Sequence, residues 1–571
     1  MTLLSVTRSN SVPVWVGAIC GVIAAGAGIA AGELVAATDA RLRGPIVAVG
    51  DRVVDNVPVA VKDWAISTFG THDKTVLLGG VAILLALFAV AIGVLARRSL
   101  PVGLAGVGVF AVVGVLAALG RGGTGWARPV PPLVAGLVAG WTLVVLVRRA
   151  RAAWPPGASA LDGGDAVPAS TPASSATPAP TTSSATPVPA ATPMSTATPA
   201  SEPMIVPGSA TDRRRFLQLS AAVAGAAILA GGVGRWMQQR GAAVAERLKV
   251  VLPKPSAPLP AIPAAVHAQG AVPFVTGNDD FYRIDTALSV PRVSTDGWTL
   301  EVLGRVERKL SLTYAELLAR PMIEADITIS CVSNEVGGNL VGTARWLGCR
   351  LDALLAEAGI DPSADQVVGR SVDGFTAGFP TTLLDGRPAL VAVGMNGEPL
   401  PIDHGYPARL IVPGVYGYVS ATKWLSQIEL TRFDEFDAYW IPRGWSRLGP
   451  IKTQSRIDTP SDGAVLTAGS TVAIAGVAWA MDRRISRVEV RVDGPNSGGR
   501  SGVGDWQDAM LATEHNDTTW RQWHLAWTPT TGEHTITVRA TDGQGVTQPE
   551  TPSDIAPDGA TGWHSVRVQA T

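Results

Sequence analysis

The 571-residue chain has few of the residues from which common cofactor and cross-link sites are built. It contains 3 cysteines and 7 histidines, and no two cysteines form a Cys-x-x-Cys pair. This excludes a zinc knuckle and an iron–sulfur cluster built from this chain alone. A single Cys331–Cys349 disulfide stays open for an oxidising compartment, but two residues make no disulfide framework. The formal net charge of -1 lacks the basic excess typical of nucleic-acid binders, so we expect no nucleic-acid partner.

Charged residues make up only 16% of the chain, and they are missing from four long apolar runs near the N-terminus. Each run is close to the roughly 20 residues that cross the hydrocarbon core of a membrane as a helix. No histidine falls within them, so we expect no membrane haem held by paired histidines. We therefore predict a four-helix transmembrane region in residues 1–150, with spans at Val14 to Gly32, Thr75 to Ala96, Pro101 to Gly120 and Val130 to Val147.

The flanking arginines and the next segment set the expected orientation. Arg8 precedes the first run, and Arg97 and Arg148 follow the second and fourth, which places the N-terminus and residue 151 in the cytoplasm. Residues 151–211 are almost entirely Ala, Pro, Ser and Thr, a composition typical of a disordered linker.

Residues 212–240 contain three consecutive arginines, Arg213 to Arg215, followed by the apolar run Leu219 to Val233. This stretch resembles a twin-arginine export signal. The alternative is a fifth transmembrane helix with a positively charged cytoplasmic flank. Both interpretations place everything after about residue 240 outside the cytoplasm, so we expect a multi-pass protein of the cell membrane with an extracytoplasmic remainder.

The remainder divides into two globular parts after a connecting segment at residues 241–273. From about Phe274 onward the pattern predicts helices at Tyr314 to Leu318 and Leu351 to Ala358, among short strands. After about Ile457, four segments alternate apolar and polar residues with turn signals between them, as in an immunoglobulin-like β-sandwich. We therefore expect an α+β domain over residues 274–450 and a sandwich over residues 451–571.

A lone thiol, Cys331, stands where a β-rich segment enters a loop rich in Gly, Asn and Ser. Taken by itself, it fits a buried, inert cysteine. Several motifs surround it in a fixed order: Thr328-Ile-Ser-Cys331, Gly342-Thr-Ala-Arg-Trp346, Met395 to Arg409, Val412-Pro-Gly-Val and Lys423-Trp424. Together they resemble the molybdopterin domain of the sulfite oxidase family over about residues 277–445. The sandwich resembles that family's C-terminal dimerisation domain, which implies a homodimer.

The resemblance implies a molybdenum–molybdopterin cofactor. Cys331 falls at the family's metal-ligand position, where one soft thiolate completes the coordination given by the two sulfurs of the pterin. His404, Arg409 and Lys423 fall at positions that hold the pterin's phosphate, and Arg283 falls at that of an active-site arginine beside the metal. The full set of cofactor-binding residues so implied is Tyr282, Arg283, Cys331, Asp373, His404, Arg409, Thr422 and Lys423.

Other interpretations of these residues remain open. Arg283 could form a surface salt bridge with Asp279 or Asp280, and Asp373 could simply form a turn before Gly374. By themselves, His404 would belong to a turn and Lys423 would be a solvated charge. Arg345-Trp346 is interpreted as a structural pair.

The chain also departs from the family. After the ligand cysteine, sulfite oxidases commonly have Ala-Gly-Asn-Arg-Arg, whereas this chain has Val332-Ser-Asn-Glu-Val336. Two positive charges are replaced, which weakens a sulfite assignment because a dianion needs a positive pocket. Trp445 aligns near the family's tyrosine. We expect a wider pocket that is less suited to anions.

These observations predict a membrane-anchored molybdenum oxidoreductase that performs two-electron oxygen-atom transfer on a small sulfur or nitrogen compound outside the cytoplasm. Its activity would resemble that of sulfite oxidase, and an external carrier would move the electrons. One alternative is a reductase of S-oxides or N-oxides, which would use the same residues. Another is a non-catalytic membrane receptor or assembly subunit that keeps the fold.

Overall fold

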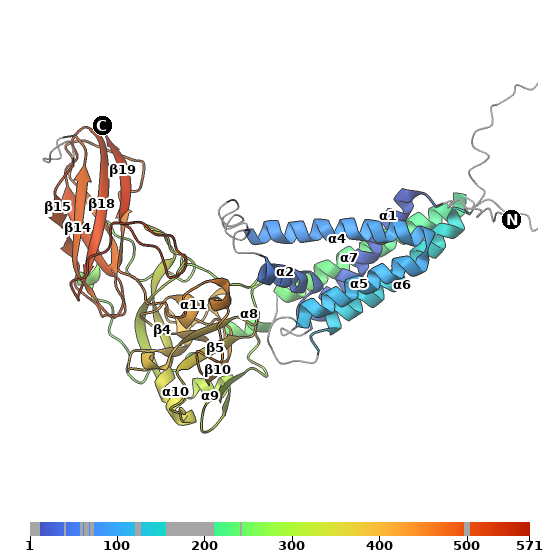
Figure 1. Cartoon of the computed structure of the whole chain (residues 1–571), viewed down its shortest axis with the longest axis horizontal. Coiled ribbons are helices and arrows are strands. Elements are labelled where there is room, and N and C mark those ends of the chain that lie inside the picture. Colours follow the sequence, from blue (N-terminus) through green and yellow to red (C-terminus); the bar gives the residue numbers. More distant parts are fainter. Residues whose placement is uncertain are drawn as a thin grey trace, which may run out of the picture. The chain divides into compact units, whose positions relative to one another are not determined.

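The computed structural model in Figure 1 describes residues 12–38, 42–57, 61, 68, 73–119, 127–155, 210–239, 242–495 and 503–571. Most of the predicted linker, residues 156–209, lies outside these ranges. The chain divides into two compact units, one built mainly of N-terminal helices and one that contains all of residues 232–571. We describe each unit by itself.

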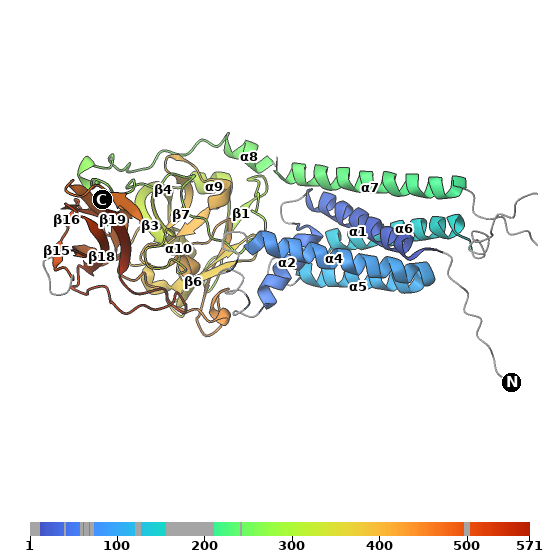
Figure 2. The same ribbon diagram turned by 90° about the horizontal axis from the view of Figure 1, so that it is seen from above.

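Five long helices of the described chain are apolar enough to cross a membrane. Four of them match the predicted spans, and the fifth includes the three consecutive arginines. Small residues permit close packing, because a Cβ added to Gly21 would lie 2.0 Å from the carbonyl oxygen of Ala89. Figure 2 shows these long helices, and a shorter one, α2 (Pro45–Asn56), precedes α4. The five are α1 (Val14–Ala36), α4 (Asp73–Arg98), α5 (Leu100–Leu119), α6 (Val130–Ala153) and α7 (Ala210–Gln239).

The α+β domain contains two sheets that pack around one core. The first has the order β2 (Leu310–Thr313), β1 (Thr299–Gly304), β10 (Leu425–Thr431), β5 (Gln366–Ser371), β6 (Thr376–Pro380). The second has the order β3 (Met322–Ser330), β4 (Val341–Arg350), β7 (Leu390–Met395), β8 (Glu398–Pro399), and β9 (Arg409–Ile411) pairs with β7. The helices are α8 (Ala242–Arg247), α9 (Tyr314–Leu318), α10 (Leu351–Ala358) and α11 (Gly417–Ser420).

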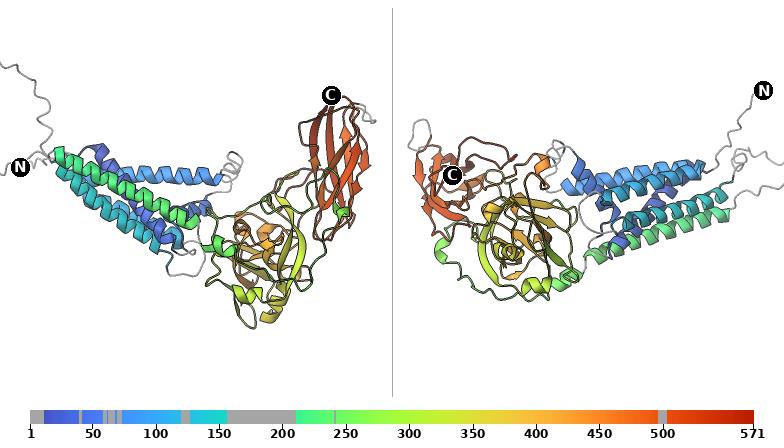
Figure 3. Two further views of the ribbon diagram at one scale, coloured as in Figure 1. Left: turned by 180° about the vertical axis from the view of Figure 1, so that it is seen from behind. Right: turned by 60° about the horizontal axis from the view of Figure 1, so that its bottom comes forward.

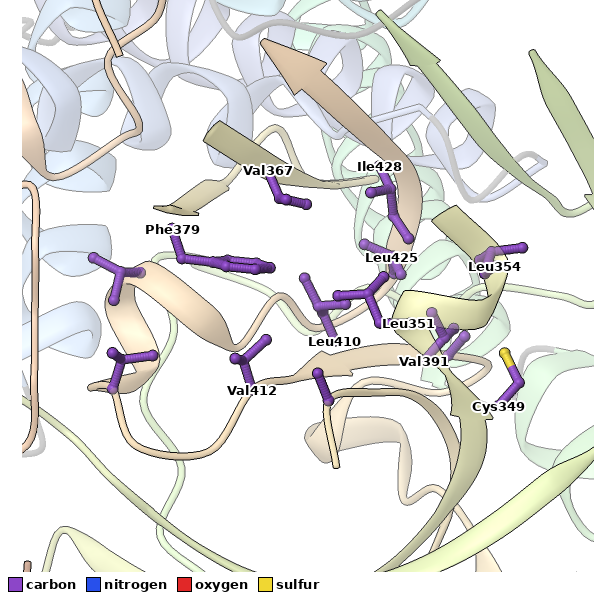
Figure 4. Packing of buried hydrophobic residues seen from close by; sticks show 14 of the residues in the cluster. Cys349, Leu351, Leu354, Val367, Phe379, Val391, Leu410, Val412, Leu425 and Ile428 are labelled. Atoms are coloured by element: carbon purple, nitrogen blue, oxygen red, sulfur yellow. The ribbon is translucent and has the colours of Figure 1, made fainter. Parts of the chain in front are cut away.

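Local sequence explains the two predicted helices of this domain. The hydroxyl of Thr313 accepts a hydrogen bond from the backbone N–H of Glu316, and the carboxylate of Glu316 accepts one from the backbone N–H of Thr313, so a capping box starts α9 at the predicted residue. Leu351, Leu354 and Leu355 lie on one face of α10 and are fully buried. In Figure 4, Leu351 and Leu354 lie among Val391, Leu410, Leu425 and Ile428, which come from strands of both sheets.

The C-terminal residues form a β-sandwich, visible as the red strands in Figure 3. One sheet has the order β11 (Gln454–Thr459), β13 (Val472–Trp479), β17 (Arg521–Trp527), β16 (Met510–Leu511). The other has the order β12 (Ala464–Leu466), β19 (His564–Ala570), β18 (Gly532–Asp542), β14 (Ile485–Asp493), β15 (Trp506–Asp508). Apolar residues alternate inward along these strands, so the predicted fold class, apolar helices followed by an α+β domain and an immunoglobulin-like sandwich, is confirmed.

The sandwich and the α+β domain share a hydrophobic core. Val477, Trp479, Met481 and Trp520 of the sandwich are at most 3% exposed and belong to the core cluster of the α+β domain. The predicted connecting segment joins the sandwich as well, because the backbone N–H of Ala268 donates to the side-chain oxygen of Gln522, on β17, at 2.8 Å. These two domains therefore pack as one body within their unit.

Candidate functional site

Cys331 follows the last residue of β3 and is followed by the ligand loop, which we define as residues 332–340. Its backbone N–H donates to Leu340 at 2.9 Å, closing the loop beneath the thiol. The residue is 9% exposed, and burial raises the pKa of the thiol. Hydrogen bonds from Ser333 and from the backbone of Val332 oppose that shift, because they stabilise the thiolate. Strand and loop thus hold a soft donor atom with polar groups directed at it.

Three basic side chains form what we call the cationic cluster: His404, Arg409 and Lys423. Arg409, at the start of β9, donates to the carbonyl of His404 at 3.1 Å. The cluster forms around a tight turn at Gly405, whose φ of +111° suits glycine. A Cβ there would lie 3.0 Å from the backbone of Lys423. The turn therefore brings the three basic residues together.

Burial dominates the electrostatics of the cationic cluster. It lowers the pKa of Arg409 to about 10, that of Lys423 to about 8 and that of His404 to about 4. Lys423 has a carboxylate partner, Asp285, at 2.8 Å, which opposes the effect of burial. The Nε of Arg409 is buried without a hydrogen-bond partner among the described residues. A buried, incompletely paired cation is costly, so the cluster is suited to receive an anion.

Cys331 and the cationic cluster line the same cavity, whose volume is about 900 Å³ with the part open to solvent included. Tyr282 lines the cavity too. Burial raises its pKa well above the ordinary value; the charge of Cys331 raises it further, and that of Arg409 lowers it. The thiol and the cationic cluster therefore face one shared space.

A second part of the cavity wall, the aromatic cluster, consists of Phe375, Tyr418, Trp440 and Trp445. The ring of Trp445 lies 5.8 Å from that of Tyr418 and 6.0 Å from that of Trp440. These are ordinary distances for interacting aromatic pairs. Among the described lining residues, the basic side chains are those of the cationic cluster alone. The aromatic cluster is therefore an apolar wall without a cation.

The structure brings together six of the eight predicted site residues. Tyr282, Cys331, Asp373 and the three members of the cationic cluster line the cavity. Arg283 and Thr422 are not among the lining residues; Thr422 is fully buried and donates to Gly369 at 3.4 Å.

Two of the alternatives can be compared with the observed contacts. Arg283 pairs with Asp285 at 2.9 Å and approaches Asp403 at 3.6 Å, rather than pairing with Asp279 or Asp280. Asp373 accepts a hydrogen bond from the backbone of Phe375 at 3.0 Å and also lines the cavity, so its turn role and its position at the site are compatible.

The sequence prediction missed several lining residues. One of them is Asp285, two positions after Arg283. It accepts a hydrogen bond from Lys423, which is 138 residues away in the sequence, so no local pattern indicates the pair. Within the ligand loop, Val332 and Ser333 line the cavity, whereas Glu335 and Val336 do not. The two positions where the family has arginines therefore lie outside the lining, and the absence of cations from this part of the cavity wall is a property of the whole aromatic cluster.

The residues present fit a molybdopterin cofactor on structural grounds. One thiol offers a soft metal ligand. Three buried basic groups, one with an unpaired nitrogen, offer what a pterin phosphate requires. The described residues contain no group of three or more His, Cys, Asp or Glu side chains that could hold a metal by themselves, so a metal here would depend on ligands from outside the chain.

Comparisons with known proteins agree with this site. Residues 287–440 match the family model described as "Oxidoreductase molybdopterin binding domain", and residues 454–538 match "Bacterial Ig domain". The chain belongs to the sulfite oxidase family of molybdopterin-dependent oxidoreductases and carries its molybdopterin-binding domain, but it spans less than two thirds of the length of the mammalian sulfite oxidases that it matches.

Individual relatives cover different shares of the chain. It is 30% identical to mitochondrial sulfite oxidase of Mus musculus over 351 residues, 52% of this chain and 62% of that protein. It is also 30% identical to the uncharacterized oxidoreductase YuiH of Bacillus subtilis over 152 residues, 27% of this chain and 74% of that one. A solved structure, the sulfane dehydrogenase SoxCD of Paracoccus pantotrophus, aligns with 53% of this chain and 83% of its own at 23% identity and a TM-score of 0.45.

Proposed function

We propose that the chain performs two-electron oxygen-atom transfer on a small S-oxide or N-oxide with apolar substituents. For an S-oxide, the S–O bond breaks, two electrons from an external carrier and two protons from solvent are taken up, and a sulfide and water leave. The observation that supports this substrate class is the composition of the aromatic cluster, which offers apolar surface and no positive charge.

The roles of the residues follow from their contacts. When bound, the molybdenum cofactor supplies the capacity to accept or give an oxygen atom together with two electrons. Cys331 would hold the metal, and the cationic cluster would hold the phosphate of the pterin. Asp285 keeps Lys423 directed toward the cavity at 2.8 Å. The aromatic cluster would bind the apolar part of the substrate and exclude water from the reacting atoms.

We further propose that the reaction takes place outside the cytoplasm, with the chain anchored by its apolar helices. The supporting observations are five helices of sufficient length and hydropathy and the arginines that flank them. Retention of α7 as an anchor, a twin-arginine route of export and a homodimer through the sandwich remain parts of this proposal. Arg283, 37% exposed at its side chain, would have to leave Asp285 and Asp403 to reach the oxygen of the substrate.

Two assays on the detergent-solubilised, cofactor-loaded full chain test the substrate class. The first supplies a reduced viologen dye with dimethyl sulfoxide or trimethylamine N-oxide, and the second supplies an artificial electron acceptor with sulfite. We expect turnover in the first assay. Turnover with sulfite alone would overturn the proposed class, and a metal-free, well-folded chain would support the non-catalytic alternative instead.

Sulfite oxidation is the second candidate. It is favoured by the 30% identity to a protein named sulfite oxidase. It requires that Arg283 move from its carboxylate partners into the cavity, because sulfite needs a cation near the reacting sulfur. A salt-dependent KM for sulfite that rises in Arg283→Met would support this candidate.

A further inference from the structure

The chain on both sides of Cys331 is fixed by the sandwich. On the near side, β3 is the edge strand of its sheet: β4 pairs with it along its length, and its free edge has one bridge, between Ile323 and Ala257. On the far side, Val332 packs in the core of its own domain, while the hydrogen bonds of the ligand loop to its own domain include those that close it on itself. A metal ligand in such a position needs support from elsewhere.

Residues 515–520, which lie between β16 and β17, supply that support before the cysteine. The backbone N–H of Thr328 donates to the carbonyl of Thr518 at 2.9 Å, and the N–H of Trp520 donates to the hydroxyl of Thr328 at 2.8 Å. The hydroxyl of Thr518 donates to the carbonyl of Asp326 at 2.9 Å. Thr328, Asp326 and Thr518 are all at most 4% exposed. These are shielded bonds, and they end three residues before Cys331.

His515 adds a polar contact to the same strand. Its Nε2 lies 2.8 Å from the carboxylate of Asp326, which also pairs with Arg345 at 2.8 Å. Arg345 in turn lies on β4, next to the fully buried Trp346. Of the pair interpreted from sequence as structural, Arg345 therefore belongs to the junction between the two domains, whereas Trp346 packs in a core of the α+β domain.

Two other sandwich residues support the loop after the cysteine. Arg456, on β11, donates to the carbonyl of Gly338 at 2.9 Å and is oriented by Asp458 at 2.7 Å. His564, which accepts the N–H of Ile457 at 3.0 Å, lies against Gly337. A Cβ on Gly337 would be 2.2 Å from the His564 ring, and its φ of +78° independently suits glycine. The loop can therefore approach the sandwich only with glycine there.

We propose that the sandwich acts as a clamp on the metal-ligand segment, in which Thr518 and Arg456 are positioning residues for Cys331. Their contacts lie on opposite sides of the thiol along the chain and both come from outside the domain that contains it. The clamp sets the position of the thiolate sulfur, and through it the metal's environment and its rate of loss. This inference rests on the proposed role of Cys331 as metal ligand.

The test uses matched pairs of variants in the cofactor-loaded full chain. Arg456→Met is compared with Arg539→Met, because Arg539 forms a similar ion pair with Glu489 at 2.9 Å entirely within the sandwich. Thr518→Val is compared with Thr537→Val, because Thr537 is a buried sandwich threonine bonded to Ser565 at 2.8 Å. The measurements are molybdenum and pterin per chain over time, and the electron paramagnetic resonance spectrum of the half-reduced metal.

We expect metal loss about ten-fold faster in Arg456→Met and Thr518→Val than in their controls, with altered spectra, as for other residues that support a ligand. Equal loss rates and identical spectra in each pair would overturn the clamp, whatever the melting temperatures. If Arg456→Met does not fold, the threonine pair decides. Cys331→Ala separates the two assumptions: retained metal in that variant refutes the ligand role, whereas lost metal with unaffected clamp variants refutes the clamp alone.

Discussion

The cationic cluster and the aromatic cluster line one cavity, yet they are held in different ways. Each member of the cationic cluster is at most 8% exposed, and burial lowers its pKa. Trp440 and Trp445 are only partly buried and contact other aromatic rings. The buried cations Arg409 and Lys423 require one specific partner, whereas edge-to-face and tilted rings accept many apolar shapes. This difference supports our proposal that the permanent cofactor binds at the first cluster and the exchanging substrate at the second.

The strongest way to test this division is to remove the thiol. Cys331→Ala should abolish oxygen-atom transfer and leave less than about a tenth of the molybdenum per chain, since the metal loses its protein ligand. Cys349→Ala is the matched control, because Cys349 is also buried, at 4% exposure, but lies in the core. Metal analysis and activity of both variants decide the matter, and equal losses in the two would count against a special role for Cys331.

Arg409→Met should weaken cofactor binding by about 10- to 100-fold, the worth of a hydrogen bond to a charged group. The cofactor-free chain should become more stable by on the order of 1 kcal/mol, because the variant removes a buried cation with an unpaired nitrogen. Pterin content and thermal denaturation of the empty and loaded chain measure the two effects. Arg409→Lys should lie between, since it keeps the charge and loses the planar donor group.

Substitutions in the aromatic cluster should change substrate binding and leave the cofactor content unchanged. Trp445→Leu should raise the KM for S-oxides by about ten-fold through the loss of ring contacts, while molybdenum and pterin per chain stay at the wild-type level. Steady-state kinetics with dimethyl sulfoxide, alongside metal analysis, tests this. An unchanged KM together with reduced metal would mean that Trp445 binds the cofactor, and it would contradict the division between the two clusters.

The last expected effect is a pH dependence of the stability of the cofactor-free chain. Burial, assisted by the charge of Arg409, lowers the pKa of His404 to about 4, whereas an unfolded histidine titrates near ~6.5. Between these values the unfolded chain binds more protons, so the free energy of unfolding should rise by on the order of 2 kcal/mol from about pH 4 to about pH 6.5 and then level off. Denaturation curves of wild type and His404→Gln measure this slope, which the variant should lack.

Sequence patterns predicted the parts of this molecule that depend on local contacts. The capping box at Thr313 fixed the start of α9, the apolar face at Leu351 and Leu354 fixed α10, and the uncharged runs marked the long helices. Family motifs identified six side chains that line the cavity. Each of these signals lies within a short stretch of chain.

The features that sequence could not provide depend on distant contacts. Lys423 meets Asp285, and Asp326 meets His515, across separations of 138 and 189 residues. Thr422 and Arg283 occupy positions implied by the family, but neither side chain lines the cavity. The clamp of the sandwich on the ligand segment has no local signature at all, apart from the glycine at position 337.

The exposed position of β3 at the end of its sheet has one more consequence. An uncovered edge strand can pair with a strand of another chain and start aggregation. Here residues 515–520 cover its later part, and Ser256 covers its beginning by donating to Met322 at 2.8 Å. A chain shortened before β11 would therefore expose an apolar edge from Ala325 to Ile329. The sandwich thus also shields the edge of β3 from pairing with a strand of another chain.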